Sequence, residues 1–128
     1  MAEPRIACVI PARAGSKRIK NKNMKFLGDR QLVRWSIDAA VESGAFNAGV
    51  WVTSDAEDIL WLAMAFRATP IHRPPALAED HVSAHAPVTH AVELIERERG
   101  ALDFVCLQQP TSPFVRPESF AAMARLMV

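Results

Sequence analysis

The sequence predicts an α/β fold in which helices flank a mainly parallel β-sheet. Four short runs of apolar, β-branched or aromatic residues have the length of strands and lie at residues 6–10, 50–53, 70–72 and 104–107. Segments with helical spacing separate these runs, so strands alternate with helices, as in α/β proteins. The chain has 128 residues, half of them hydrophobic. That is enough for one core, and we expect residues 1–128 to form a single domain.

The helices are predicted from apolar periodicity and from residues typical of helix ends. The segment Ser54-Asp55-Ala56-Glu57 matches a capping box, and Pro87 suits the first turn of a helix. Gly44 and Gly100 are typical of residues that follow a helix. We therefore expect helices at Leu32–Glu42, Asp55–Phe66, His85–Arg99 and Glu118–Met127.

The order of the strands in the sheet follows from the handedness of their connections. Right-handed crossovers favour the order third, second, first, fourth. The direction of winding then reverses between the first and fourth strands, and ligands bind at the carboxyl ends of the strands beside such a reversal. The basic segment Pro11–Lys25 and the segment Gln108–Pro113 follow these two strands. The sequence thus predicts that both loops face one binding crevice.

The charge of the chain is local. Its net charge is +1 at pH 7, so there is no overall basic field for nucleic acid or a membrane surface. No apolar run has the length of a membrane span, and the run after MAEPR is too short for a secretory leader. We expect a cytoplasmic protein with neither nucleic acid nor a membrane as partner.

The cysteines and two of the histidines have plain interpretations. Cys8 and Cys106 each lie inside an apolar run, and we expect two reduced, buried thiols in preference to a disulfide or a metal site. His81 and His85 have the spacing of two ligands on one helix face. They lack the glutamate of H-E-x-x-H and a third ligand, so no metal site is assigned to this chain.

The loop after the first strand has the composition of a phosphate-binding segment. It contains no acidic residue before Asp29, and its cations include Arg13, Lys17, Arg18, Lys20 and Lys22. An arginine can grip two phosphate oxygens, and lysines act as point charges. Gly15 and Ser16 allow a tight turn, and Ser16 adds a hydroxyl donor. The loop is neither a Walker A loop nor a G-x-G-x-x-G fingerprint. The alternative is a solvated basic loop.

The exact sequence of this loop is more specific evidence of function than its charge. The segment Ile-Pro-Ala-Arg-Ala-Gly-Ser-Lys-Arg-Ile at 10–19, followed by Lys22-Asn23, resembles the signature of the acylneuraminate cytidylyltransferases. These enzymes make CMP-sialic acid and its bacterial relatives, CMP-pseudaminic and CMP-legionaminic acid. The resemblance extends over about residues 6–120, through Trp35-Ser36-Ile37, Val52-Thr53-Ser54-Asp55, Arg73-Pro74, Leu77-Ala78-Glu79-Asp80 and Leu107–Pro113.

The resemblance implies a Rossmann-like fold of the nucleotide-diphospho-sugar transferase type and a reaction. The reaction joins CTP to a nonulosonic acid, giving the CMP-sugar and pyrophosphate. It implies nucleotide-binding roles for Arg13, Gly15, Ser16, Lys17, Lys22, Asn23, Arg73 and Ser83. Arg13 and Lys22 would also be catalytic, since they would stabilise the leaving pyrophosphate, and Gln109 would face the acceptor sugar. Each has an ordinary alternative: Asn23 could cap a turn, Gln109 could satisfy loop backbone, and Arg73 could be a surface cation.

The chain also departs from the family pattern. Ala84 and His85 stand where the family often has a second Ser or Thr after the position of Ser83, which puts that contact in doubt. Family enzymes are longer, so we expect the chain to be the N-terminal part of the family domain, truncated at its C-terminus. The ligands of the expected Mg²⁺ would then lie outside this chain. Asp55 is interpreted as a helix-start residue.

The resemblance further implies a homodimer that takes CTP and a sialic-acid-like sugar. Trp35, Trp51 and Trp61 are expected in the core or at an interface, and an exposed patch of Trp61, Leu60 and Met64 would fit a subunit contact. Two other functions stay open. One is a truncated, inactive nucleotide-binding module of the same fold, and the other is a nucleotidyltransferase for another sugar or nucleotide.

Overall fold

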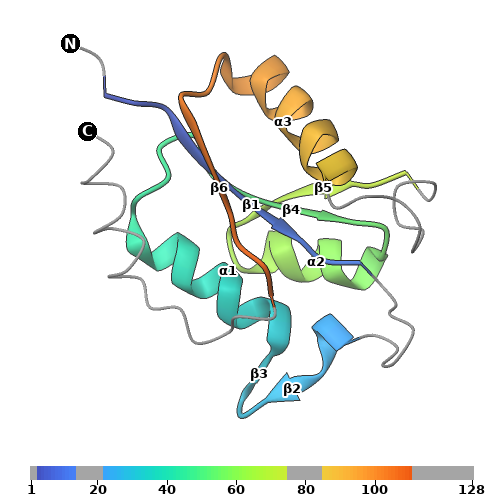
Figure 1. Cartoon of the computed structure of the whole chain (residues 1–128). Coiled ribbons are helices and arrows are strands. Elements are labelled where there is room, and N and C mark those ends of the chain that lie inside the picture. The colour runs from blue at the N-terminus through green and yellow to red at the C-terminus, as the bar shows by residue number, and fades with distance from the viewer. Residues whose placement is uncertain (1–2, 14–21, 75–84, 111–128) are drawn as a thin grey trace.

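The centre of the molecule is a four-stranded parallel sheet (Figure 1). The computed structural model describes residues 3–13, 22–74 and 85–110. The sheet has the order β5-β4-β1-β6, and its strands are β1 (Ile6–Pro11), β4 (Val50–Ser54), β5 (Thr69–His72) and β6 (Phe104–Leu107). This is the predicted order of third, second, first and fourth strands, and every adjacent pair is parallel. The predicted reversal of winding between β1 and β6 is confirmed.

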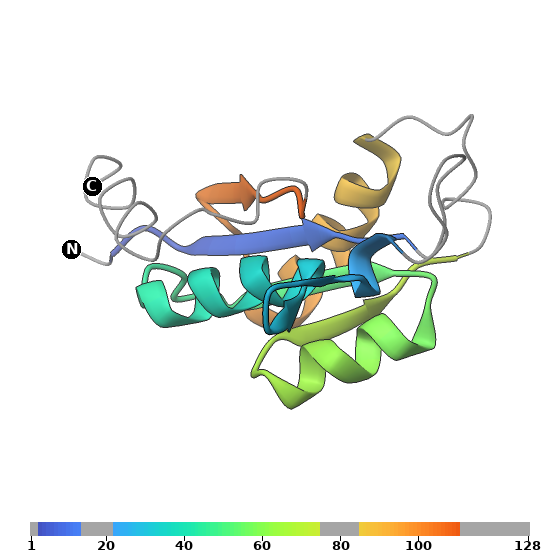
Figure 2. The same ribbon diagram turned by 90° about the horizontal axis from the view of Figure 1, so that it is seen from below.

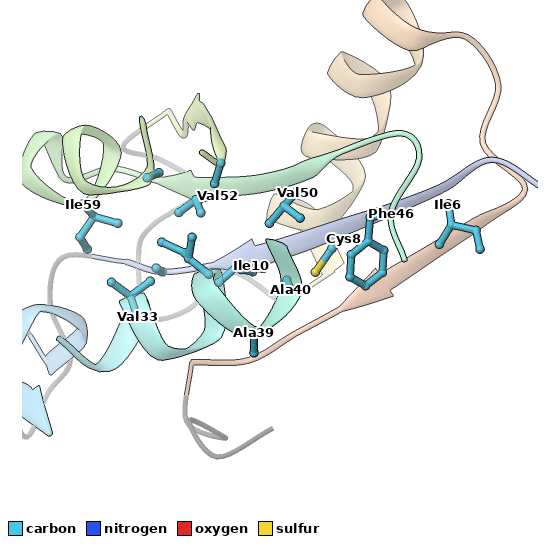
Figure 3. Close-up of a cluster of buried hydrophobic side chains, with 14 residues drawn as sticks. Ile6, Cys8, Ile10, Val33, Ala39, Ala40, Phe46, Val50, Val52 and Ile59 are labelled. Carbon is cyan, nitrogen blue, oxygen red and sulfur yellow. The ribbon is translucent and has the colours of Figure 1, made fainter. Parts of the chain in front are cut away.

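Helices cover both faces of the sheet (Figures 1 and 2). α1 (Leu32–Ser43) and α2 (Glu57–Ala65) lie on one face, and α3 (His85–Arg99) lies on the other. The residues of β1 alternate between two apolar clusters. Ile6, Cys8 and Ile10 pack on the side of α1 (Figure 3), and Ala7 and Val9 pack with α3. Burial on both faces explains why β1 is one continuous apolar run, as expected of a parallel strand.

α1 and α3 agree with the helices predicted from the sequence. The buried positions Val33, Ile37 and Ala40 recur on one face of α1, which is the spacing of an amphipathic helix. α1 ends one residue later than predicted, before Gly44 in the left-handed conformation at φ 64°. α3 has the predicted bounds, with Pro87 in its first turn.

The predicted capping box of α2 is wrong. The helix begins at Glu57, two residues later than predicted, and its N-cap residue is Ala56, which has no side-chain cap. Ser54 is the last residue of β4, and its Oγ accepts a hydrogen bond from the Ala56 N–H at 3.0 Å. The serine lies too early in the chain to cap the helix. Its hydrogen bond instead stabilises the turn that follows the strand.

A small hairpin between the basic loop and α1 was not predicted. It consists of β2 (Phe26–Leu27) and β3 (Arg30–Gln31), which are antiparallel and joined through Gly28 at φ 72°. The indole Nε1 of Trp35 donates to the Leu27 carbonyl oxygen at 2.7 Å. The Arg30 guanidinium donates to Asp38 at 2.7 Å. These contacts with α1 side chains attach the hairpin to that helix.

The three tryptophans occupy different environments. Trp51 is buried, and Trp35 is half-buried under the guanidinium of Arg30, which lies 4.8 Å from its ring centroid. Trp61 and Met64 on α2 are 70% and 57% exposed, so the patch considered in the sequence is at the surface. The predicted helix Glu118–Met127 lies outside the described residues. None of the described helices has the length and apolarity to cross a membrane.

Two glycines with positive φ, one of them crowded and the other not, give a prediction about stability. Gly44 and Gly49 both have positive φ, at 64° and 99°, but only Gly49 is crowded: a Cβ there would lie 2.9 Å from Nε1 of Trp51. Gly44→Ala should lower the free energy of unfolding by about 1–2 kcal/mol, because an L-residue is strained in this conformation. Gly49→Ala should lower it further, because the indole is held by its hydrogen bond to the Ala48 carbonyl. Urea denaturation of both variants measures the difference, and equal losses would contradict the crowding.

Candidate active site

Backbone hydrogen bonds bring three strand ends together at the carboxyl edge of the sheet. The carbonyl oxygen of Thr53, in β4, accepts from the Ala12 N–H at 2.9 Å and from Nη2 of Arg73 at 3.2 Å. The N–H of Arg73 donates to the Ser54 carbonyl oxygen at 2.7 Å. The end of β1, the end of β4 and the residue after β5 are thus fixed relative to one another.

Arg73 is a buried cation at this edge. Only 4% of the residue is exposed, and its Nε has no hydrogen-bond partner among the described residues. Burial lowers the pKa of the Arg73 guanidinium, Asp55 opposes that change, and the positive charge of Arg13 adds to it. Arg13 and Arg73 are therefore close enough to repel each other, and an anion bound beside them would stabilise the pair beyond what Asp55 already supplies.

Lys22 and Asn23 are held next to the end of β1. They belong to the 3₁₀-helix η1 (Lys22–Met24), which Figure 2 shows beside the arrowhead of β1. Nδ2 of Asn23 donates to the Arg13 carbonyl oxygen at 3.0 Å. Met24 packs against the apolar cluster beneath α1. The turn is therefore anchored from both sides, and Lys22 lies on the same edge as Arg13.

The end of β6 supplies two glutamines with different roles. The Gln108 N–H donates to the Val9 carbonyl oxygen at 3.0 Å, and the residue is buried. Its Nε2 donates to the Gln109 carbonyl oxygen at 3.1 Å, and Gln109 itself is exposed. Gln108 therefore shapes the loop, and Gln109 is the residue accessible to a ligand. Both lie at the end of a strand that neighbours β1.

Five of the residues singled out in the sequence are at this edge: Arg13, Lys22, Asn23, Arg73 and Gln109. Gly15, Ser16, Lys17 and Ser83 lie outside the described residues. No role was predicted for Gln108 individually, and Asp55 was predicted to start a helix. Asp55 precedes α2 and interacts electrostatically with Arg73. Its position directly after a buried strand was the available signal.

The acids of the described residues do not form a metal centre. Within residues 3–13, 22–74 and 85–110, no group of three or more His, Cys, Asp or Glu side chains could hold a metal ion. The carboxyl edge of the sheet instead carries cationic and amide side chains, which hydrogen bonds hold in place. This arrangement can bind a polyanion and stabilise negative charge that develops on it.

Comparison with known proteins identifies the family. The family model described as cytidylyltransferase matches residues 7–127. This chain belongs to the cytidylyltransferase family. A pseudaminic acid cytidylyltransferase of Campylobacter jejuni is 38% identical over 113 residues, which cover 87% of this chain and 48% of that protein. An N-acylneuraminate cytidylyltransferase A of Danio rerio is 35% identical over 122 residues, covering 95% and 27%. The resemblance to acylneuraminate cytidylyltransferases is confirmed.

A solved structure shares the fold of this chain. The structure of a CMP:2-keto-3-deoxy-manno-octonic acid synthetase complexed with CTP superposes with a TM-score of 0.78 at 22% identity, over 96% of this chain and 47% of that one. The predicted Rossmann-like architecture of nucleotidyltransferases is therefore confirmed. The chain spans about half the length, or less, of the relatives described here.

The paired arginines predict stabilisation by an anion. Inorganic pyrophosphate should raise the thermal midpoint of unfolding. At a concentration about one hundred times its dissociation constant, it should raise the free energy of unfolding by about 2.7 kcal/mol. Arg73→Met should reduce this increment, because one of two neighbouring cations is lost. Arg97→Met, on the exposed side of α3, is the control and should retain it. Equal reductions in both variants would show that only net charge matters.

Proposed function

We propose that this chain is the CTP-binding part of an enzyme that activates a nonulosonic, sialic-acid-like sugar as its CMP derivative. The observation that carries the proposal is the pair Arg13 and Arg73 at the carboxyl edge of the sheet, in a chain of the cytidylyltransferase family. The Campylobacter and Danio relatives, by their names, act on such sugars. The structural neighbour was solved with CTP, which supports the choice of nucleotide.

In the proposed reaction, the anomeric hydroxyl of the sugar attacks the α-phosphorus of CTP and pyrophosphate leaves. Negative charge accumulates on the departing phosphates as the bond breaks, so fixed cations beside them lower the barrier. We assign this catalytic role to Arg13 and Lys22. The assignment is supported by two contacts: the Ala12 N–H bonds to the Thr53 carbonyl just before Arg13, and the Asn23 side chain joins the turn that contains Lys22 to the Arg13 carbonyl.

The remaining proposed contacts orient the two substrates. Gly15, Ser16, Lys17 and Asn23 would bind the phosphates and ribose with Arg13 and Lys22. Arg73 would place the cytidine, which is supported by its fixed position and by its buried Nε, which has no hydrogen-bond partner within the described part of the chain. Ser83 would add a nucleotide contact, and Gln109, exposed beside the end of β1, would face the acceptor sugar. Orientation of this kind contributes much of the rate in a displacement between bound reactants.

The cofactor and the assembly are proposed at a coarser level. Magnesium would neutralise charge on the phosphates. The described residues contain no cluster fit to hold it, so its protein ligands are proposed outside them and no step here depends on it. A homodimer is supported by the exposed Trp61 and Met64. A cytoplasmic location is supported by the free thiols Cys8 and Cys106.

Binding of nucleotides tests the proposal directly. In titration calorimetry with magnesium present, the chain should bind CTP more tightly than ATP, GTP or UTP, and Arg13→Ala should weaken the binding of CTP. Removing one charge-assisted contact costs about 1.5–3 kcal/mol, which corresponds to an affinity loss of roughly tenfold to a hundredfold. A folded chain that binds no nucleotide would overturn the assignment.

Two asparagines, whose side chains bond to backbone at or beside opposite ends of β1, provide a test variant and a matched control for CTP binding. Asn23 bonds to the Arg13 carbonyl, and Asn47 accepts from the Ile6 N–H and donates to the Pro4 carbonyl, each at 2.8 Å. Asn23→Ala should weaken CTP binding, because it frees the turn that carries Lys22. Asn47→Ala should leave the affinity of the folded chain unchanged, because it acts at the far end of the strand. Similar losses in affinity would place the effect in general stability.

Turnover separates an active enzyme from an inactive nucleotide-binding module. Pyrophosphate release should require CTP together with a nonulosonic acid, and it should be measured on the longest available gene product as well as on the 128-residue chain. Release with a different nucleotide or sugar would keep the fold and change the substrate. Binding of CTP without release from either protein would favour the inactive module.

A further inference from the structure

Cys8 and Cys106 are direct neighbours on two parallel strands. They are register partners between β1 and β6, which lie side by side in Figure 1. The Cys8 side chain lies in the apolar cluster beneath α1 (Figure 3), and Cys106 packs against the same cluster. Adjacent strands are about 4.7–4.9 Å apart, which falls inside the Cα separation of about 4.4–6.8 Å that a disulfide spans. At that separation the Cys8 S–H is within reach to donate a hydrogen bond to the sulfur of Cys106.

The two thiols are chemically unequal. Cys8 is fully buried, and Cys106 is half-buried because β6 is an outer strand of the described sheet. The hydrogen bond from Cys8 lowers the pKa of Cys106, against the opposing effect of burial. The same bond and burial raise the pKa of Cys8. The thiolate, which is the reactive form of a cysteine, is therefore favoured on the more accessible sulfur.

A resident metal ion does not account for this pair, because the described residues supply no third ligand. Two isolated buried thiols would be inert. A thiolate with a thiol beside it instead has the arrangement of an attacking and a resolving cysteine.

We propose that Cys106 and Cys8 form a peroxide-sensitive pair that closes a reversible disulfide between β1 and β6. The Cys106 thiolate attacks one oxygen of hydrogen peroxide, the O–O bond breaks, and the departing hydroxide takes up a proton to become water. The Cys8 thiol then attacks the resulting sulfenic sulfur, the S–O bond breaks, and a second water leaves with the Cys8 proton. Overall, two thiols and one peroxide give one disulfide and two waters.

The position of the pair makes the bond reversible and connects it to the candidate site. Residues directly opposite on parallel strands can be joined only with some strain, and strained disulfides are readily reduced by small thiols. The two strands continue to Arg13 and Gln109 at the carboxyl edge. The disulfide would therefore fix the separation of the strands that carry the two sides of the site. This inference rests on the register of the strands and does not depend on the proposed function.

Peptide mapping after oxidation tests the proposal. The full chain is treated with hydrogen peroxide, its remaining thiols are alkylated in denaturant, and its tryptic peptides are weighed. The expected result is a linked pair of peptides carrying Cys8 and Cys106, which dithiothreitol separates. Full alkylation of both cysteines, a sulfinic acid on Cys106 with Cys8 still free, or linkage only between chains would each overturn it.

A pair of variants at Cys8 tests the role of its hydrogen bond. Cys8→Ser keeps an O–H donor next to Cys106, and Cys8→Ala removes it, while neither can form the disulfide. Below the pKa of Cys106, alkylation by iodoacetamide should be faster in Cys8→Ser, about tenfold for each unit by which the two pKa values differ. Peroxide should give a dimedone-reactive sulfenic acid on Cys106 in Cys8→Ser. Identical pH profiles in the two variants would overturn the assignment.

A third variant keeps the proposal testable if changes at the buried Cys8 prevent folding. Cys106→Ser alters a half-buried residue on an outer strand. After the same peroxide treatment, its Cys8 should remain fully alkylatable, because the attacking thiolate is gone. Oxidation of Cys8 in this variant would show that Cys8 reacts by itself, and the proposed order of attack would be wrong.

Discussion

The carbonyl oxygen of Thr53 is the point on which the candidate site depends. It receives one hydrogen bond from the backbone N–H of Ala12, the residue after β1, and another from the guanidinium of Arg73. A buried guanidinium costs free energy unless its donors are satisfied, and this carbonyl satisfies one of them within a parallel sheet. The hydrogen bond from Ala12 fixes the direction in which the chain leaves β1, and therefore the position of Arg13 in the basic segment. The Thr53 carbonyl thus both joins neighbouring strands and fixes the residues of the candidate site.

Much of the fold was predictable because its signals are local or topological. The strand order follows from the handedness of crossovers, and α3 follows from fifteen residues of helical pattern with a proline at its start and a glycine after its end. The hairpin of β2 and β3 was not predictable in this way. Its strands have two residues each, too few for a periodic pattern, and it is held by Trp35 and Asp38, which lie on a helix.

The site was predictable to the extent that its residues are carried by a motif. The cations after β1 and the glutamine after β6 could be proposed from the sequences of the two loops. The burial of Arg73 could not, because it depends on carbonyl oxygens of a different strand and on the charges of Asp55 and Arg13. The capping box failed for a similar reason. Its serine was already used by the strand before the helix, and a four-residue pattern carries no information on where the strand ends.

The bond between Asn23 and the Arg13 carbonyl has a consequence for the chain between them. Together with the hydrogen bonds of β1 and the attachment of the hairpin to α1, it fixes both ends of residues 14–21 within the folded frame. The entropy of bringing those ends together is therefore lost during folding, and a ligand does not have to supply it on binding. Because that entropy grows only with the logarithm of loop length, at about 0.6 kcal/mol for each doubling, the segment is free to change its length and sequence at little expense to the scaffold. The sequence between Arg13 and Lys22 can then vary while the sheet stays the same.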